Sequence, residues 1–410
     1  MGGDPPDVLS ILKITKGKTL KDPYRQLEIL QQALSSDKSR IAFLLGAGCP
    51  VSIRTPEGNP LIPNIAGLTD GICLKLKTKK IDNIKKRIQL PAGKTATIED
   101  ILTHVRLLIE VVGCGKIDEF CKNDLENLEK DICVEISNIV KQELPNSETP
   151  YHKLASWIQG IQRNNSVEIF TPNYDLLIES ALESKGIPYF DGFIGSINAF
   201  FDLHAIEQEV LPARWVKLWK LHGSINWWNS KHEVFRSHTE VGMGKQMIFP
   251  SHLKYDQSRR MPYLAMQDRL GHFLATGQAI LMVCGYSFVD QHLNSIIMQR
   301  LSANPRAICF GLLFDELDNY PDAIKCAKKT TNLTLLAKNG TYIGGQRKGW
   351  DSKDTSISNT LGFCVERQVD DNKNVVSVNC TIGDFKVLGE FLSNQIGQEQ
   401  QMNNEAGHEN

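Results

Sequence analysis

Short apolar runs alternate with segments of helical periodicity along most of the chain. Apolar runs at 41–45, 166–170, 279–288 and 307–314 have the length and composition of buried strands. Strands with few polar residues, separated by helices, are typical of a parallel sheet that is covered on both faces. The pattern therefore predicts an α/β fold with a parallel sheet and helices on both of its faces.

Helices are predicted between these strands. Residues 21–40 place Leu27, Leu30 and Leu34 at helical spacing. The same periodicity predicts further helices at 65–77, 99–112, 116–143, 150–163, 174–186, 262–276, 290–301 and 382–394. Weaker strand patterns lie at 214–223, 226–228, 246–249, 332–337 and 374–380. Because several helices separate the first two strands, we expect a helical insertion at about 66–163.

The pattern divides the chain into four parts. We expect an N-terminal helical segment at 1–40, a main domain at 41–313 and a C-terminal α/β extension at 314–394. The last residues, 395–410, are polar and are predicted to be a disordered tail.

Composition excludes several classes of protein. The 410 residues are 41% hydrophobic and 23% charged, with a formal net charge of -1, as in globular proteins. The near-neutral charge gives no argument for nucleic-acid binding, and no apolar run approaches the roughly 20 residues of a membrane span. The first residues lack the apolar run of a signal peptide, so we expect a cytoplasmic protein. The basic stretch at 75–87 is interpreted as a solvated face, with an acidic partner as the alternative.

Polar or glycine-containing loops follow four of the predicted strands, at the edge where parallel sheets bind ligands. The loops are "GAG" at 46–48, "TPNYD" at 171–175, "LHG" at 221–223 and "GYSFVD" at 285–290. The candidate residues within them are Gly46, Ala47, Gly48, Thr171, Asn173, Asp175, His222, Gly285, Ser287 and Asp290. We expect these residues to meet at one site.

Each loop also has a purely structural interpretation. The glycines can form a tight turn, His222 can be an ordinary loop histidine, and the polar residues of the second and fourth loops can cap helices. A helix cap explains only one of Asn173 and Asp175, however, and Gly223 permits close approach to the imidazole. One shared site accounts for all four loops, whereas the structural interpretation requires four separate coincidences.

The first loop differs from the dinucleotide-binding loop of dehydrogenases. That loop has a third small residue in G-x-G-x-x-G/A, where this chain has Val51. Two glycines still allow backbone N–H groups to approach phosphate or ribose oxygens. Ser52 is a candidate hydrogen-bond donor, and Arg54 is a candidate phosphate ligand with a surface charge as its alternative. The pattern indicates a Rossmann-like nucleotide site of another kind.

In their order along the chain, GAG-C-x-x-S, T-P-N-Y-D, L-H-G and G-Y-S-x-x-D resemble the motifs of the sirtuin-like NAD-binding family over about 41–313. The resemblance is strongest to its bacterial branch, which hydrolyses NAD in anti-phage defence. Protein deacylases of this family carry a zinc ribbon of two C-x-x-C pairs after the His-Gly motif. The ten cysteines of this chain form no such pair. The resemblance thus implies NAD binding without a metal and argues against removal of acyl groups from lysine.

The resemblance implies cleavage of the bond between nicotinamide and ribose, with water giving ADP-ribose. Asn173 would hold the ribose and the water, Asp175 would orient the ribose or stabilise its developing positive charge, and His222 would act as general base. The other candidates would line the dinucleotide: Gly46, Ala47, Gly48, Ser52, Arg54, Thr171, Gly285, Ser287 and Asp290.

The resemblance also implies control of this activity, because unrestrained loss of NAD harms the host cell. Several relatives act as oligomers and some assemble on a HerA-type hexameric ATPase. We therefore expect a homo-oligomer that acts in abortive infection, with a HerA-type ATPase as a candidate partner. Two alternatives remain open: a sensor that binds NAD or ADP-ribose without catalysis, and a metal-free protein deacylase.

Overall fold

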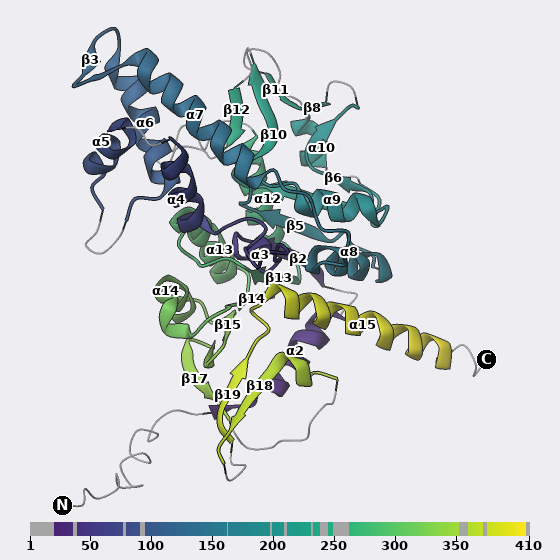
Figure 1. Cartoon of the computed structure of the whole chain (residues 1–410). Coiled ribbons are helices and arrows are strands. Elements are labelled where there is room, and N and C mark those ends of the chain that lie inside the picture. The colour runs from purple at the N-terminus through teal and green to yellow at the C-terminus, as the bar shows by residue number, and fades with distance from the viewer. Residues whose placement is uncertain are drawn as a thin grey trace, which may run out of the picture.

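A ten-stranded sheet lies at the centre of the molecule (Figure 1). The structure is a computed structural model, which describes residues 20–35, 39–76, 79–90, 95–161, 163–196, 199–208, 211–230, 233–237, 245–248, 262–351, 360–371 and 375–406. In sheet order the strands are β1 (Leu20–Lys21), β17 (Gln346–Trp350), β16 (Gly340–Ile343), β15 (Leu333–Ala337), β14 (Ala307–Leu312), β13 (Ala279–Cys284), β2 (Arg40–Leu45), β5 (Glu168–Thr171), β9 (Val216–Lys220) and β6 (Tyr189–Phe190).

The neighbouring strands from β15 to β6 all run parallel. Apart from the two-residue β6, the order across the sheet from β9 to β15 is third, second, first, fourth, fifth and sixth along the chain. This is the strand order of a Rossmann fold, in which the chain changes direction across the sheet between the first and fourth strands. That change occurs here between β2 and β13, and the predicted Rossmann-like α/β fold is confirmed.

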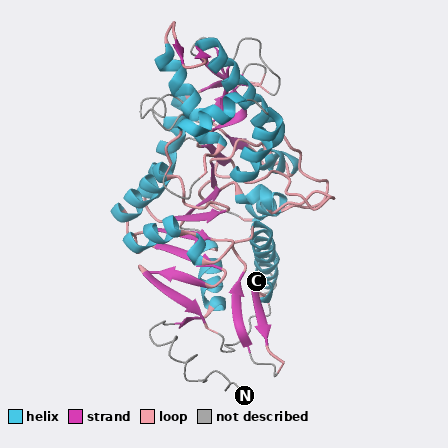
Figure 2. Cartoon of the chain, turned by 60° about the vertical axis from the view of Figure 1, so that its left-hand side comes forward, coloured by secondary structure: helices cyan, strands magenta, loops and turns pink. Residues whose placement is uncertain are grey.

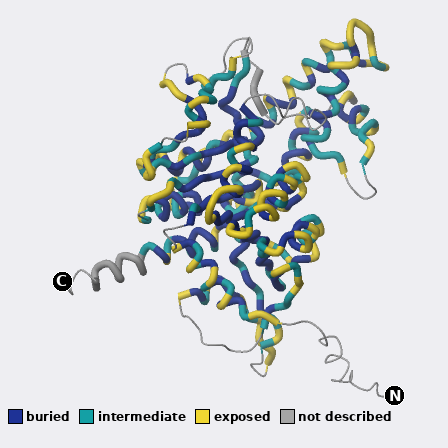
Figure 3. Tube along the Cα trace, turned by 180° about the vertical axis from the view of Figure 1, so that it is seen from behind, coloured by how far each residue is buried: buried dark blue, intermediate teal, exposed yellow. Residues whose placement is uncertain are grey.

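Helices cover both faces of the sheet. Along β2, Ile41, Phe43 and Leu45 belong to one core cluster, whereas Ala42 and Leu44 belong to another, because successive side chains of a strand point to opposite faces. The first cluster includes side chains of α2 (Pro23–Leu34), α8 (Pro150–Gly160), α9 (Leu177–Ser184) and α15 (Phe385–Ala406). The second includes side chains of α12 (Tyr263–Ala275), α13 (Gln291–Ala303) and α14 (Pro321–Lys329). Figure 2 shows these layers, and Figure 3 shows buried strands between more exposed helices.

The predicted helical insertion is present between β2 and β5, at the upper left of Figure 1. It consists of α4 (Ile65–Leu76), α5 (Lys79–Arg87), α6 (Ile98–Val112) and α7 (Lys122–Val140). α6 begins at a capping box in which Thr97 and Asp100 bond each other's backbone N–H groups. α8, which we expected to belong to the insertion, instead packs along α15 against the sheet.

A second, antiparallel sheet carries the segment that follows β9. In sheet order its strands are β12 (Lys245–Ile248), β10 (Gly223–Ser230), β11 (Glu233–Arg236), β8 (Ala199–Phe201) and β7 (Phe193–Ile194). The helix α10 (Leu203–Gln208) follows β8. The strands predicted at 226–228 and 246–249 therefore lie outside the parallel sheet.

Three other expectations differ from the structure: the helix at 116–143, the extension at 314–394 and the tail at 395–410. The helix predicted at 116–143 begins only at α7, because β3 (Lys116–Ile117) and β4 (Phe120–Cys121) form a hairpin around Asp118, whose φ of 52° is left-handed. The extension at 314–394 is continuous with the main sheet, to which it adds β15, β16 and β17, and it also contains the hairpin of β18 (Val365–Val369) and β19 (Val375–Cys380). Among the described residues, the 3₁₀ helix η1 (Leu317–Asn319) precedes α14, and the 3₁₀ helix η2 (Gly362–Cys364) precedes β18.

The predicted disordered tail overlaps α15, which continues to Ala406. Gln395, the first residue of the predicted tail, is buried. Its Oε1 accepts a hydrogen bond of 3.1 Å from the indole N–H of Trp157 in α8. Polar composition alone therefore misjudged this helix, since one polar side chain has a buried partner. Residues 407–410 lie outside the described residues. Within the described ranges, no helix combines the length and apolar character needed to span a lipid bilayer.

Candidate functional site

The four loops singled out in the sequence follow β2, β5, β9 and β13, which are neighbours in the sheet. Because these strands are parallel, all four loops leave the same edge of the sheet. The change of direction between β2 and β13 lies in the middle of this edge. It is the position at which open α/β sheets bind their ligands.

The glycine loop after β2 packs directly against the loop after β13. The backbone N–H of Gly46 donates to Cys284 O at 2.9 Å, and that of Gly48 donates to Gly285 O at 2.8 Å. A Cβ atom on Gly48 would lie 2.8 Å from the Cα of Gly285, and one on Gly285 would lie 2.5 Å from the backbone nitrogen of Cys49. The glycines are thus required for contact between two loops, and two of the N–H groups expected to face phosphate have protein partners. Ala47 and Gly48 are nevertheless exposed at this edge.

Asn173 is anchored on the glycine loop. Its side-chain Nδ2 donates to Gly46 O at 3.1 Å, and its backbone N–H donates to the Thr171 hydroxyl at 3.0 Å. Thr171 is buried and its hydroxyl donates in turn to Leu45 O at 2.7 Å, which makes it a support of the loop. Asn173 itself is half-buried. The structure therefore brings together the first two loops around the Asn173 amide.

The residue after Asn173 connects this loop to the helical insertion. The buried Tyr174 donates from its hydroxyl to Glu99 Oε1 of α6 at 2.7 Å. Its backbone carbonyl accepts a hydrogen bond of 3.1 Å from the N–H of Ile225 in β10. The loop is thus held from the insertion on one side and from the second sheet on the other.

Asp175 lies beneath the site. It is buried, and its Oδ1 accepts from the backbone N–H of Leu177 at 3.1 Å at the start of α9. Burial raises the pKa of Asp175, an effect that the ammonium of Lys220 opposes. Lys220 donates to the backbone carbonyl of Asp175 and forms an ion pair of 3.1 Å with Glu179. These contacts make Asp175 a support of the Asn173 loop, and its expected role at the ribose stays a prediction.

His222 is paired with the fourth loop. Its Nε2 lies 3.1 Å from Oδ2 of Asp290, and the side chains of both residues are largely buried. The other oxygen of Asp290 caps α13, accepting from the backbone N–H groups of His292 at 2.9 Å and Leu293 at 3.0 Å. A carboxylate can accept from Nε2 only when that nitrogen carries the proton, so the lone pair of the neutral ring is on Nδ1. Asp290 thereby fixes the tautomer and the orientation of His222.

The loop that carries Asp290 has an unusual backbone. Phe288 is buried and has a left-handed φ of 59°, a conformation that is strained for a residue with a side chain. Asn294 of α13 holds this turn, because its Nδ2 donates to Phe288 O at 2.6 Å. Ser287, one residue earlier, is exposed at the edge of the sheet. Strain held by a tertiary hydrogen bond is typical of functional loops.

Ser52 and Arg54 are not brought to His222. The Ser52 hydroxyl donates to Cys49 O at 2.7 Å, and Arg54 is exposed. Both residues line a cavity of about 610 Å³ beside α8 and α15, together with Lys153 and Lys386. The described lining of this cavity includes neither Asn173 nor His222.

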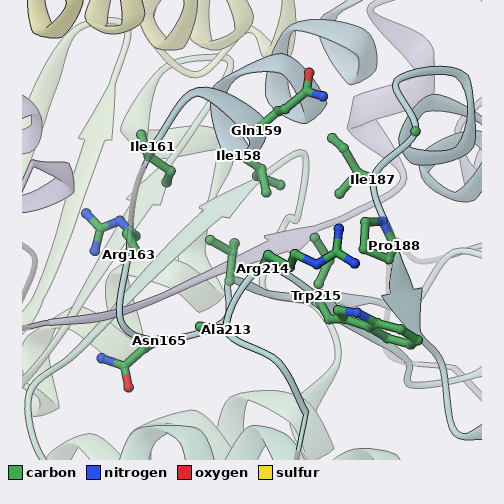
Figure 4. Close-up of a pocket in the computed structure, with 13 residues that line it drawn as sticks. Ile158, Gln159, Ile161, Arg163, Asn165, Ile187, Pro188, Ala213, Arg214 and Trp215 are labelled. Atoms are coloured by element: carbon green, nitrogen blue, oxygen red, sulfur yellow. The ribbon is translucent and has the colours of Figure 1, made fainter.

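A second cavity, of about 460 Å³, lies at the opposite edge of the sheet (Figure 4). Its lining includes Val167 and Val216, at the amino ends of β5 and β9, and the side chains of Arg214 and Trp215. The loops that carry Asn173 and His222 leave the carboxyl ends of the same strands. This cavity is therefore separate from the candidate site.

Two residues beneath the site were missed in the sequence. Lys220 ends a strand that is mostly buried, and Glu179 lies among the buried residues of α9. A charged residue at such a position is a signal for a buried ion pair, because burial of an unpaired charge is unfavourable. In the part of the chain that the structure describes, no group of three or more His, Cys, Asp or Glu side chains could hold a metal ion.

Comparison with known proteins identifies a known domain type over part of this chain. Residues 167–332 match the SIR2-like domain. No curated protein matches the chain significantly. Solved structures with similarity include one that describes the mechanism and regulation of Sir2 enzymes, with 15% identity over 70% of this chain and 86% of that one, and a TM-score of 0.34. A Sir2 homologue in complex with NAD has 13% identity over 72% of this chain and 86% of that one, with a TM-score of 0.38.

A variant Sir2 homologue in complex with ADP-ribose has 14% identity over 72% of this chain and 88% of that one, with a TM-score of 0.32. At these scores the fold assignment rests on the strand order described above. The SIR2-like match includes the loops of Asn173, His222 and Asp290, and begins after the glycine loop. The match over residues 167–332 supports a sirtuin-like family for this chain.

Proposed function

We propose that this protein is an NAD glycohydrolase, which cleaves NAD to nicotinamide and ADP-ribose. The observation that carries the proposal is the pairing of His222 with Asp290 at 3.1 Å, on the same sheet edge as Asn173 and the glycine loop. The SIR2-like match over 167–332 supports it. The complexes of Sir2 homologues with NAD and ADP-ribose are in keeping with this choice of substrate and product.

The exposed part of the sheet edge suits a dinucleotide. Ala47, Gly48 and Ser287 are exposed there, while Asn173 is half-buried between them and His222 is mostly buried. Small residues let a ligand approach the backbone, and the amide and imidazole supply directional polar groups. We assign Ala47, Gly48 and Ser287 to the phosphates and adenosine side, and Asn173 and His222 to the ribose next to nicotinamide.

The reaction needs little chemistry from the protein. The bond between ribose C1′ and the nicotinamide nitrogen breaks, and its electron pair leaves with neutral nicotinamide. Water then adds to C1′ and loses one proton, so NAD⁺ and water give ADP-ribose, nicotinamide and a proton. In the proposed mechanism His222 accepts a proton at Nδ1, from the water or through a ribose hydroxyl, because Asp290 holds the proton on Nε2. Asn173 orients the ribose through its amide.

The test is NAD consumption by the purified protein, with nicotinamide and ADP-ribose quantified. We expect His222→Ala to lower turnover by about 10²–10⁴-fold, the usual contribution of a general base, and Asn173→Ala to lower it by a similar factor. His204→Ala is the matched control, because His204 is an exposed histidine on α10 that bonds only its neighbour Gln208 among the contacts described. Its turnover should remain within about twofold of the native value, as expected for a surface change.

Other outcomes identify the alternatives. Saturable NAD binding without turnover would favour the sensor, and nicotinamide release that depends on an acyl-lysine peptide would favour the deacylase. We further propose that the protein acts on the cytoplasmic NAD pool in anti-phage defence, as a homo-oligomer or together with a HerA-type hexameric ATPase. Turnover that starts only when such an ATPase is added to the inactive chain would support that assignment; unchanged inactivity with every partner would contradict the hydrolase.

A further inference from the structure

A buried lysine lies between the loops of Asn173 and His222. Lys220 is the last residue of β9, two residues before His222, and only 1% of it is exposed. Its ammonium donates to the backbone carbonyl of Asp175, two residues after Asn173. One side chain therefore reaches from the strand that leads to His222 into the loop that carries Asn173.

Glu179 neutralises this lysine from below. Its Oε1 lies 3.1 Å from Nζ of Lys220, and it stands in the first turn of α9, directly after the Asn173 loop. Its second oxygen is buried and has no hydrogen-bond partner among the described residues. Burial raises the pKa of the Glu179 carboxyl, and Lys220 opposes that shift. The ammonium is thus the charged partner that allows this carboxylate to be buried.

The backbone between the two loops is joined at two further points. Leu221 N–H donates to Thr171 O at 2.8 Å, and Ile225 N–H donates to Tyr174 O at 3.1 Å. These bonds hold the beginning and the middle of the Asn173 loop. The end of the loop, at Asp175, is held from β9 by the Lys220 side chain. A charged donor makes shorter and stronger hydrogen bonds than a neutral one, which suits it to fixing a loop.

We propose that Lys220 is a positioning residue of the candidate site: held by Glu179, its ammonium fixes the Asp175 carbonyl and so sets the place of Asn173 relative to His222. This inference rests on the proposed NAD hydrolysis for its kinetic effect. Its structural effect, an ordered Asn173 loop, is measurable without any substrate. An extended side chain that only filled the core would affect stability but would not set this geometry.

The experiment compares Lys220→Met, Glu179→Gln and the double variant with Lys217→Met. Lys217 is the matched control, because it lies on the same strand and pairs with the buried Glu168 at 3.9 Å, near the other end of β9. Each variant is examined for kcat and KM with NAD, for its thermal unfolding midpoint, and for amide hydrogen exchange of peptides covering 171–176 and 279–284. The strand at 279–284 reports on the sheet as a whole.

For Lys220→Met we expect kcat to fall about 100-fold, the effect of misplacing a reacting group by about 1 Å, while KM changes less than about threefold. Exchange should rise at 171–176 and stay unchanged at 279–284. The double variant removes the unpaired carboxylate, so its unfolding midpoint should recover toward the native value while kcat stays low. Lys217→Met should keep kcat within about twofold of native.

A double variant that regains kcat together with its unfolding midpoint would overturn the proposal, because Lys220 would then serve stability alone. Unchanged kcat in Lys220→Met would overturn it as well. If the native chain does not hydrolyse NAD, the proposed function fails, but hydrogen exchange still tests the positioning role of Lys220. Faster exchange in Lys220→Met at 171–176 alone supports that role. Exchange that is unchanged, or that rises uniformly, rejects it. If Lys220→Met does not fold, the double variant, which has no unpaired buried charge on this pair, carries the same comparison.

Discussion

Asp290 uses its two carboxylate oxygens for two different purposes. Oδ1 caps α13 through the N–H groups of His292 and Leu293, and Oδ2 faces Nε2 of His222. The helix cap expected of this residue is therefore confirmed, and its expected contact with the dinucleotide stays a prediction. Aspartate can accept hydrogen bonds at both of its oxygens, whereas the asparagine amide of the same size has only one oxygen.

Two substitutions of Asp290 should separate these purposes. Asn caps helices as well as Asp does, so Asp290→Asn should retain native stability while placing an amide N–H₂ against Nε2. We expect its NAD turnover to fall at least about tenfold, because the ring loses its carboxylate partner. Asp290→Ala should lose the same activity and, in addition, about 1 kcal/mol of unfolding free energy, measured in urea. Native turnover in Asp290→Asn would show that the pairing with His222 has no role.

At the scale of elements, the closest contact in the site is between the loops after β2 and β13. Gly285 has a left-handed φ of 67°, and an added Cβ would lie 2.5 Å from the backbone nitrogen of Cys49. Gly58 provides a matched comparison, because its φ is 83° and an added Cβ would meet nothing within 4 Å. The two positions share the conformational requirement for glycine and differ in the space around it.

Alanine at both positions should therefore measure the loop contact alone. We expect Gly58→Ala to cost about 1–2 kcal/mol of unfolding free energy, the strain of a left-handed backbone. Gly285→Ala should cost about 1–3 kcal/mol more, because the two loops must move apart, and it should also lower NAD turnover. Equal losses of unfolding free energy for Gly285→Ala and Gly58→Ala in urea titrations would show that separating the two loops costs no free energy.

The same contact shows what could be predicted from the sequence. The apolar runs at 41–45 and 279–288 predicted two strands of the sheet, the second of which ends at Cys284, and the loops after the strands predicted the edge of the candidate site. Local sequence did not reveal that the N–H groups of Gly46 and Gly48 donate to carbonyls about 240 residues later in the chain. Ser52 and Arg54 were assigned by their closeness in sequence to the glycines. They follow the short α3 (Gly48–Val51) and line another cavity, and their contact with the dinucleotide stays a prediction.

At the scale of the whole molecule, the two core clusters enclose several ionisable side chains. Burial raises the pKa of Asp175 and Glu179 above the usual values near 4, and it also raises the pKa of Asp191, although Arg236 opposes that shift. Below about pH 4 both the folded and the unfolded chain hold these protons. As the pH rises, the unfolded chain releases them first, so these carboxyls reduce stability progressively until the folded chain releases them too.

Glu179→Gln should make this dependence visible. The variant cannot release a proton at this position, so its unfolding free energy relative to the native protein should rise as the pH increases from about 4 through the raised pKa. The variant also loses the partner of Lys220, which shifts the difference in unfolding free energy at every pH. The test is therefore the rise of that difference with pH. Glu207→Gln, at an exposed position on α10, is the matched control for the substitution itself. Urea titrations between pH 4 and 8 provide the measurement, and a flat or falling difference for Glu179→Gln would contradict the assignment.

The hydrogen bond between Tyr174 and Glu99 has a consequence for regulation. It joins the residue next to Asn173 to the first turn of α6, so the conformational free energy of the Asn173 loop depends on the position of the insertion. Any protein that binds the insertion and displaces α6 changes the affinity for substrate by some factor, and thermodynamic reciprocity requires substrate to change that protein's affinity by the same factor. Under the proposed NAD hydrolysis, a fall in the NAD concentration would therefore change the affinity of such a protein for the insertion.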